Sequence, residues 1–173
     1  MKPTISVCTI VKNEEKQMND FLFSLVDFAD EIIIVDTGSV DKTIEIIESY
    51  LKKYNNIKFL KYESEGVFHY GKAKNFSLKQ ATKDYFIILD ADERLSADFR
   101  NKLKDFLEKE KPNVAKVKRI DEYIQHLVDY PERIIKNNLG ILYSTDTKNV
   151  VHENLNYAKK VNVFDETVWH QQR

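Results

Sequence analysis

Four short apolar runs, separated by stretches with helical spacing, constrain the fold more than any other feature of this sequence. The runs are rich in β-branched side chains and occupy residues 5–11, 32–35, 57–62 and 85–89. Short apolar runs bounded by polar residues are typical of strands in a buried, parallel sheet. The alternation of strand and helix through residue 110 therefore predicts an α/β fold, with a mainly parallel sheet and helices on both faces.

The stretches between these runs carry apolar residues at intervals of three and four, which indicates amphipathic helices. We expect helices over residues 14–27, from about 41 to 51, over 72–82 and over 96–109. Either Ser39 or Asp41 is expected to cap the second of them, because short polar side chains accept hydrogen bonds from the first free amides of a helix.

The pattern changes after Pro112, where no clear helix follows. Residues 114–120 alternate between apolar and polar, which predicts a half-exposed strand. Further short strand candidates lie at residues 133–135, 140–143, 150–151 and 161–164. We expect one domain over residues 1–173, with two functional halves that meet near residue 110.

Polar residues follow the predicted strands at 9–14, 36–39 and 90–94. Carboxyl ends of parallel strands share one edge, which is where open α/β sheets bind ligands. If Asp90 and Asp92 stay extended, they point to the same side, roughly 6.5–7 Å apart at the backbone. Such a pair suits Mg²⁺ or Mn²⁺. The alternative is a solvated acidic turn before the helix that begins near Ser96.

Composition narrows the class of protein without naming a function. The net charge of −1 gives no basic footprint of the kind that nucleic-acid binding requires. The single cysteine, Cys8, excludes a disulfide framework and fits a cytoplasmic setting. No apolar run approaches the length of a membrane-spanning helix, and the first residues lack the features of a signal peptide.

Five blocks of sequence, in this order and spacing, resemble family 2 glycosyltransferases with the GT-A fold. The blocks read SVCTIVKNE (6–14), DEIIIVDTGSVDKT (30–43), GKAKN (71–75), LDADER (89–94) and VVHE (150–153). They are most similar to the subgroup that contains bacterial lipopolysaccharide-core β-glucosyltransferases and related peptide glycosyltransferases. The resemblance covers nearly the whole chain and implies a donor half at residues 1–110 and an acceptor-side half at 111–173.

The resemblance implies roles for the residues that end each strand. A nucleoside diphosphate sugar would be bound by Thr9, Val11, Asn13, Glu14, Asp36, Ser39, Lys72, Asn75 and Asp90. Lys72 and Asn75 open a predicted helix, whose free amides favour a diphosphate. Asp90 and Asp92 would hold Mn²⁺ or Mg²⁺ as a Lewis acid against the leaving diphosphate. The alternatives are core strand residues for Thr9 and Val11, a turn cap for Asp36 and a surface lysine for Lys72.

The acceptor side rests on fewer residues. The enzymes that this chain resembles invert configuration, so they need a base near the acceptor hydroxyl, and the resemblance places Glu153 there. Many relatives carry an acidic pair at this point, whereas this chain has His152 and Glu153; a strand-end salt bridge is the alternative. His170 is a candidate third metal ligand beside Asp90 and Asp92.

The function implied is a metal-dependent, inverting transfer of a hexose from a nucleotide sugar, with UDP favoured, to a saccharide, lipid-linked or peptide acceptor. Family members usually continue beyond the His-Glu block, so this chain is a compact enzyme, a shortened one or part of a longer protein. Such a parent could associate peripherally with the inner face of the membrane. Two other enzyme classes fit poorly: nucleotidyltransferases carry a Gly-rich loop after the first strand, and phosphohydrolases place the aspartate pair there. A nucleotide-sugar-binding module without transfer activity stays open.

Overall fold

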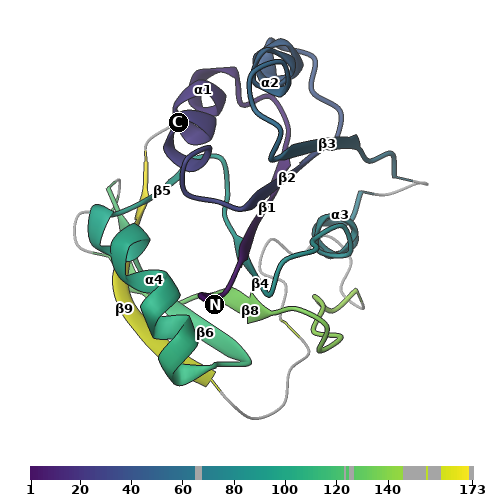
Figure 1. Cartoon of the computed structure of the whole chain (residues 1–173). Helices are drawn as coiled ribbons and strands as arrows, with labels where there is room; N and C mark the ends of the chain where they lie inside the picture. Colours follow the sequence, from purple (N-terminus) through teal and green to yellow (C-terminus); the bar gives the residue numbers. More distant parts are fainter. Residues whose placement is uncertain (65–67, 123, 125–126, 146–154, 156–160, 172–173) are drawn as a thin grey trace.

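The computed structural model describes residues 1–64, 68–122, 124, 127–145, 155 and 161–171 (Figure 1). The helices are α1 (Glu15–Leu25), α2 (Thr43–Leu51), α3 (Tyr70–Leu78) and α4 (Ala97–Glu110). The strands are β1 (Ile5–Val11), β2 (Glu31–Asp36), β3 (Ile57–Lys61), β4 (Tyr85–Ile88), β5 (Glu93–Leu95), β6 (Val114–Asp121), β7 (Val128–Asp129), β8 (Glu132–Lys136) and β9 (Val161–His170).

The strands form one sheet with the order β3-β2-β1-β4-β8-β6-β9-β5, and β7 pairs with β6. In the first half of this order, β3, β2, β1 and β4 are all parallel, as the alternation of strand and helix predicted. The predicted fold class is therefore confirmed. Its parallel half brings the carboxyl ends of β1, β2 and β4 to the same edge.

The second half of the order mixes strand directions. β8 lies antiparallel to both β4 and β6, β9 is parallel to β6, and β5 is antiparallel to β9. The sheet is strongly curled, so that β5 at its end lies beside α1 in Figure 1. Arg94 of β5 joins the two elements by donating to the backbone oxygen of Gln17 at 3.1 Å.

Helices cover both faces of the sheet, because successive side chains of each strand point to opposite faces. On one face, residues such as Ile32, Ile34 and Ile87 pack with α1, α2 and α4. On the other, Cys8, Ile33, Val35 and Phe86 pack with Leu78 and Phe76 of α3. The central strands β1, β2 and β4 are therefore mostly apolar and buried on both faces, as expected for strands covered by helices on both sides.

Several boundaries differ from the sequence prediction. Ser96 caps α4 by accepting from the Phe99 amide at 3.1 Å, which confirms the expected start of that helix. The predicted strand at residues 140–143 is wrong, since only Tyr143 forms an isolated bridge, with Leu155. β9 is longer than expected, β5 and β7 were not predicted, and residues 150–151 lie outside the described residues. In the part of the chain that the structure describes, no helix is both long and apolar enough to cross a bilayer.

Candidate active site

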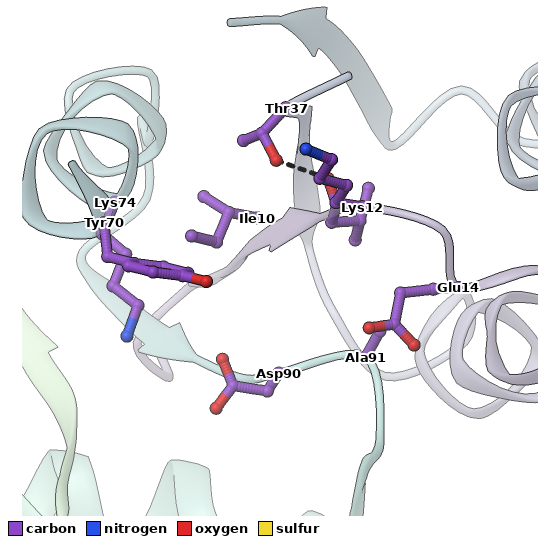
Figure 2. Close-up of a pocket in the computed structure, with 9 residues that line it drawn as sticks. Ile10, Lys12, Glu14, Thr37, Tyr70, Lys74, Asp90 and Ala91 are labelled. Carbon is purple, nitrogen blue, oxygen red and sulfur yellow. Dashed lines mark hydrogen bonds between the residues drawn. The ribbon is translucent and has the colours of Figure 1, made fainter. Parts of the chain in front are cut away.

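A cavity of about 310 Å³ opens where β1 and β4 end (Figure 2). Its lining residues are Ile10, Val11, Lys12, Glu14, Thr37, Tyr70, Lys74, Asp90 and Ala91. The residues come from the end of β1, from the segments that follow β1, β2 and β4, and from the first turns of α3. This is the edge where the sequence placed a ligand site, and the volume is within the range of small-molecule pockets.

Three of the predicted donor-binding residues line this cavity: Val11, Glu14 and Asp90. In Figure 2, the Asp90 carboxylate lies on the same side as the Lys74 ammonium, whereas Glu14 lies across the cavity from Tyr70 and Lys74. Thr9 does not line the cavity, because it is buried within β1, with 2% of its surface exposed. The cavity therefore presents a cation next to a carboxylate, with apolar and aromatic surface around them.

The loops after β1 and β2 are joined by side chains that the sequence had assigned to the nucleotide. Asp36 accepts from the amides of Gly38 at 3.0 Å and Ser39 at 3.1 Å, and Gly38 has the positive φ of 106° that favours glycine. Ser39 Oγ accepts from the Asn13 amide, and Asn13 Oδ1 accepts from the Val40 amide, both at 2.9 Å. Asp36, Ser39 and Asn13 thus shape the wall behind Thr37.

The lysine that α3 contributes to the cavity is Lys74 and not Lys72. Residues four apart share a face of a helix, so Lys74 lies one turn after Tyr70, whereas residues two apart face different ways. Lys72 lines a separate hollow with Tyr62, Glu63 and Ser64. Sequence reasoning missed Tyr70 and Lys74 because it began the helix two residues late, at Lys72. The signal was present in the spacing of Tyr70 and Lys74.

Asn75 lies beneath the surface of this region and serves the backbone. Its amide nitrogen donates to the Tyr143 oxygen at 2.9 Å, and its amide oxygen accepts from the Tyr143 nitrogen at 2.8 Å. The ring of Tyr143 then lies 5.2 Å from the Lys74 ammonium. Asn75 therefore fixes the segment that carries Tyr143 against α3, and it is not among the residues that line the cavity.

Asp90 and Asp92 do not continue β4 in an extended form, so that expectation is wrong. The chain turns after β4, with the Glu93 amide donating to the Asp90 oxygen at 3.0 Å. The Glu93 carboxylate in turn accepts from the Asp90 amide at 3.0 Å. As a result Asp90 lines the cavity, whereas Asp92 is only 2% exposed and its Oδ2 lies 3.3 Å from His170 Nε2.

Arg133 of β8 lies against this turn and was not predicted. Its Nη2 is 3.4 Å from Asp90 Oδ2 and also contacts Glu93 Oε1, while Arg119 Nη1 lies 3.6 Å from the same Glu93 oxygen. Burial alone would raise the pKa of Asp90, but the positive charges of Arg133 and Lys74 outweigh it and lower that pKa. Burial raises the pKa of Glu93 despite Arg133. Asp90 is therefore held as an anion in the cavity.

His170, at the end of β9, lies between two carboxylates. Its Nδ1 is 3.0 Å from Asp121 Oδ2 of β6, and its Nε2 faces Asp92. Burial alone would lower the pKa of His170, but Asp121 and Asp92 outweigh it and raise that pKa. Among the residues that the structure describes, no three His, Cys, Asp or Glu side chains form a ready-made metal cluster. Glu153 and His152 lie outside the described residues.

Comparison with known proteins identifies the family. The model of glycosyl transferase family 2 matches residues 6–162. The chain belongs to this family. It is 26% identical to a glycosyltransferase of Rickettsia bellii, in an alignment that covers 96% of this chain and 59% of that protein. It is 35% identical to the lipopolysaccharide core biosynthesis glycosyltransferase LpsC of Rhizobium meliloti, over 61% of this chain and 38% of LpsC.

Solved structures confirm the fold of this family 2 chain. The crystal structure of residues 1–349 of Staphylococcus aureus TarS superposes with a TM-score of 0.78 at 20% identity, covering 97% of this chain and 60% of that one. A mannosyltransferase of Pyrobaculum calidifontis, solved with GDP-Man and Mn²⁺, gives a TM-score of 0.61 at 20% identity, with coverage of 84% and 49%. The GT-A fold is thus confirmed, and the chain spans less than two thirds of the length of these proteins.

Proposed function

We propose that this family 2 chain binds a nucleoside diphosphate sugar in the cavity at the ends of β1 and β4 and transfers its hexose. One observation carries the proposal: Asp90 and Lys74 lie together in a cavity at the carboxyl edge of a parallel sheet. A diphosphate needs a cation, and the sugar and ribose hydroxyls need a carboxylate acceptor. A nucleoside diphosphate sugar carries both kinds of group, so it matches both side chains.

In this proposal the diphosphate lies near the amino end of α3, where Lys74 contacts it. Val11, Glu14 and Thr37 face the nucleoside from the opposite wall, and Tyr70 adds aromatic surface. Thr9, Asn13, Asp36 and Ser39 act through the shape of that wall. Lys72 and Asn75, the residues that the resemblance suggested for the diphosphate, are assigned to a neighbouring hollow and to the Tyr143 backbone respectively.

The residues present fit a divalent cation that is shared with the diphosphate. Mg²⁺ sites of this kind use one or two carboxylates plus substrate phosphates, so a cluster of three protein ligands is not required. The side chains of Asp92 and His170 lie 3.3 Å apart, and Asp90, two positions before Asp92 in the sequence, lines the cavity. These three would hold Mn²⁺ or Mg²⁺. When bound, the metal would neutralise charge that develops on the leaving diphosphate.

Transfer with inversion requires a base on the acceptor side, and we assign that role to Glu153. The resemblance is the support for this residue. We likewise propose a donor half at residues 1–110 and an acceptor-side half at 111–173. Two residues of the second half contact the proposed donor site: Arg133 contacts Asp90, and His170 contacts Asp92.

The acceptor class follows from what the relatives' names say of those proteins. LpsC is described as acting in lipopolysaccharide core biosynthesis, and TarS as a poly(ribitol-phosphate) β-N-acetylglucosaminyltransferase with structures in complex with UDP and UDP-GlcNAc. We therefore propose a UDP-sugar donor and a saccharide acceptor of a cell-surface polymer. We also propose lipid-linked and peptide acceptors as further candidates. A longer protein that contains this chain could act at the inner face of the membrane.

The decisive experiment is a calorimetric titration of UDP in the presence of Mn²⁺ and then of EDTA. We expect metal-dependent binding in the wild type, with strong loss in Asp90→Ala and Asp92→Ala. Asp105→Ala is the matched control, because Asp105 is an exposed carboxylate of α4 that pairs with Lys2, away from the cavity. Binding that ignores both metal and Asp92 would overturn the metal assignment.

Transfer is tested separately by release of UDP from UDP-sugars with saccharide acceptors. Donor binding with neither transfer nor donor hydrolysis would instead support a nucleotide-sugar-binding module. Binding of GDP in place of UDP would change the donor and leave the cavity assignment intact. Failure of all nucleoside diphosphates to bind would refute the proposed function.

A further inference from the structure

Three strands from different parts of the chain meet around the imidazole of His170. Along the sheet, His170 of β9 is paired with Glu93 of β5 on one side and with Asp121 of β6 on the other. Asp92 immediately precedes β5, so its carboxylate and that of Asp121 reach the ring from two directions. The sheet thereby brings together a histidine and two carboxylates that are distant in the sequence.

The two contacts of the ring differ in kind. Nδ1 lies 3.0 Å from Asp121 Oδ2, which is hydrogen-bond distance, whereas Nε2 lies 3.3 Å from Asp92 Oδ2. A neutral imidazole carries one N–H, and a carboxylate can only accept, so the shorter contact places the hydrogen on Nδ1. The lone pair of the neutral ring is then on Nε2, the nitrogen that faces Asp92.

From this geometry we propose that Asp121 is a positioning residue that orients His170 and selects the tautomer in which Nε2, beside Asp92, is free to bind a divalent cation. The inference rests on the proposed function, which supplies the cation. Histidines that bind metals generally donate their other ring N–H to a carboxylate or carbonyl, and loss of that partner typically weakens metal binding by roughly 10-fold to 100-fold.

The backbone around His170 is held without the Asp121 side chain. The Gln171 amide donates to the Asp92 oxygen at 2.7 Å, and the Glu122 amide donates to the His170 oxygen at 3.1 Å. β6 and β9 are paired in parallel along their length. Asp121 Oδ1 also accepts from the Ile124 amide at 3.2 Å, so removing the carboxylate loosens the turn after β6 as well as the contact with the ring. The pairing of β6 with β9 does not depend on this side chain, so its role at the ring can be tested by substitution.

The first test reads the tautomer in the metal-free protein. Long-range ¹H–¹⁵N NMR at alkaline pH, where the ring is neutral, is expected to show hydrogen on Nδ1 in the wild type. In Asp121→Ala we expect hydrogen on Nε2, because the Asp92 carboxylate still faces that nitrogen while Nδ1 has lost its carboxylate acceptor. Glu122→Ala is the control: it removes the neighbouring, exposed carboxylate, and thus the same charge, without touching the ring. An unchanged tautomer in Asp121→Ala would overturn the inference.

The second test measures Mn²⁺ affinity in the presence of UDP by electron paramagnetic resonance. Asp121→Ala is expected to weaken binding by roughly 10-fold to 100-fold, and Glu122→Ala by less than about twofold. Asp121→Asn keeps the shape and one acceptor oxygen, so it should retain more affinity than Asp121→Ala. It also keeps the inference testable if the alanine variant folds poorly.

The two measurements separate failure of the inference from failure of the proposed function. A wild type that binds no Mn²⁺ with UDP would refute the metal site, whatever the tautomer. A wild type that binds Mn²⁺, with the same affinity in Asp121→Ala, would refute the positioning role and leave the proposed function standing.

Discussion

The guanidinium of Arg133 and the carboxylate of Glu93 form a buried ion pair, and the same guanidinium reaches Asp90 in the cavity. The Arg133 side chain is 7% exposed and that of Glu93 is fully buried. Glu93 also holds the Asp90 amide, so the pair supports both the backbone and the side chain of Asp90. The shape and charge of the cavity therefore depend on an interaction that lies behind it.

Breaking this pair from one side should be far more harmful than removing both partners. Arg133→Met leaves the Glu93 carboxylate buried, with the Asp90 amide as a hydrogen-bond donor and the Arg119 guanidinium 3.6 Å away, so we expect a loss of about 3–5 kcal/mol in the free energy of unfolding. The double variant Arg133→Met/Glu93→Gln should recover most of that loss. Urea unfolding of the wild type, both single variants and the double variant measures the coupling; additive losses would contradict it.

The two lysines near the start of α3 should differ in their effect on nucleotide binding. Lys74→Met removes the cation beside Asp90 from the cavity and leaves Lys12, whereas Lys72→Met removes a cation from the neighbouring hollow. A charged hydrogen bond contributes about 1.5–3 kcal/mol, so the dissociation constant for UDP should rise roughly 10-fold or more in Lys74→Met. Calorimetry should find Lys72→Met close to the wild type. The reverse order would return the diphosphate to Lys72.

Asn75 is predicted to matter for stability through the backbone of Tyr143. Asn75→Ala removes both hydrogen bonds and leaves a buried amide and carbonyl to find other partners, at a cost on the order of 2–3 kcal/mol. Asn101→Ala, at an exposed position of α4, should change stability little. Hydrogen exchange offers a local check, because the Tyr143 amide should lose its protection in Asn75→Ala and keep it in Asn101→Ala.

Glu31 should make the stability depend on acid pH. Burial alone would raise its pKa, but hydrogen bonds from Ser6 and Thr82 outweigh it and lower the pKa below the ordinary value of 4.5. A group with a lowered pKa in the folded state stabilises the protein above its unfolded pKa, and this contribution is lost as the pH falls through the folded value. Glu31→Gln should therefore destabilise the protein near neutrality and approach the wild type in acid.

Urea unfolding between about pH 3 and pH 7 measures this difference. Glu48→Gln, an exposed change of the same kind on α2, should differ from the wild type by a small and nearly constant amount. A constant difference for Glu31→Gln as well would show that its hydrogen bonds do not favour the ionised form.

Local sequence patterns predicted much of the fold. The runs at β1, β2 and β4 are apolar on both faces, so their burial and parallel pairing followed from composition and spacing. The start of α4 at Ser96 and the polar residues at the strand ends could be predicted from the sequence in the same way. Val11, Glu14 and Asp90, which follow or end two of these strands, line the cavity for this reason, and their role in binding a donor stays a prediction. The choice between Lys72 and Lys74 depended on where α3 begins, a boundary that spacing locates only within a residue or two.

What the sequence by itself determined is the alternation of strands and helices, the edge of the sheet at which the cavity lies and the Asp90 carboxylate at that edge. Only the tertiary structure decided that β8 inserts beside β4 and that β9 lies between β6 and β5. The first pairing brings Arg133 to Asp90, which is 43 residues away in the sequence. The second brings His170 to Asp121, which is 49 residues away, and to Asp92. Backbone pairing has no residue code, because any extended segment can hydrogen-bond to any other. The partners of the site were therefore selected by how the whole sheet packs and curls.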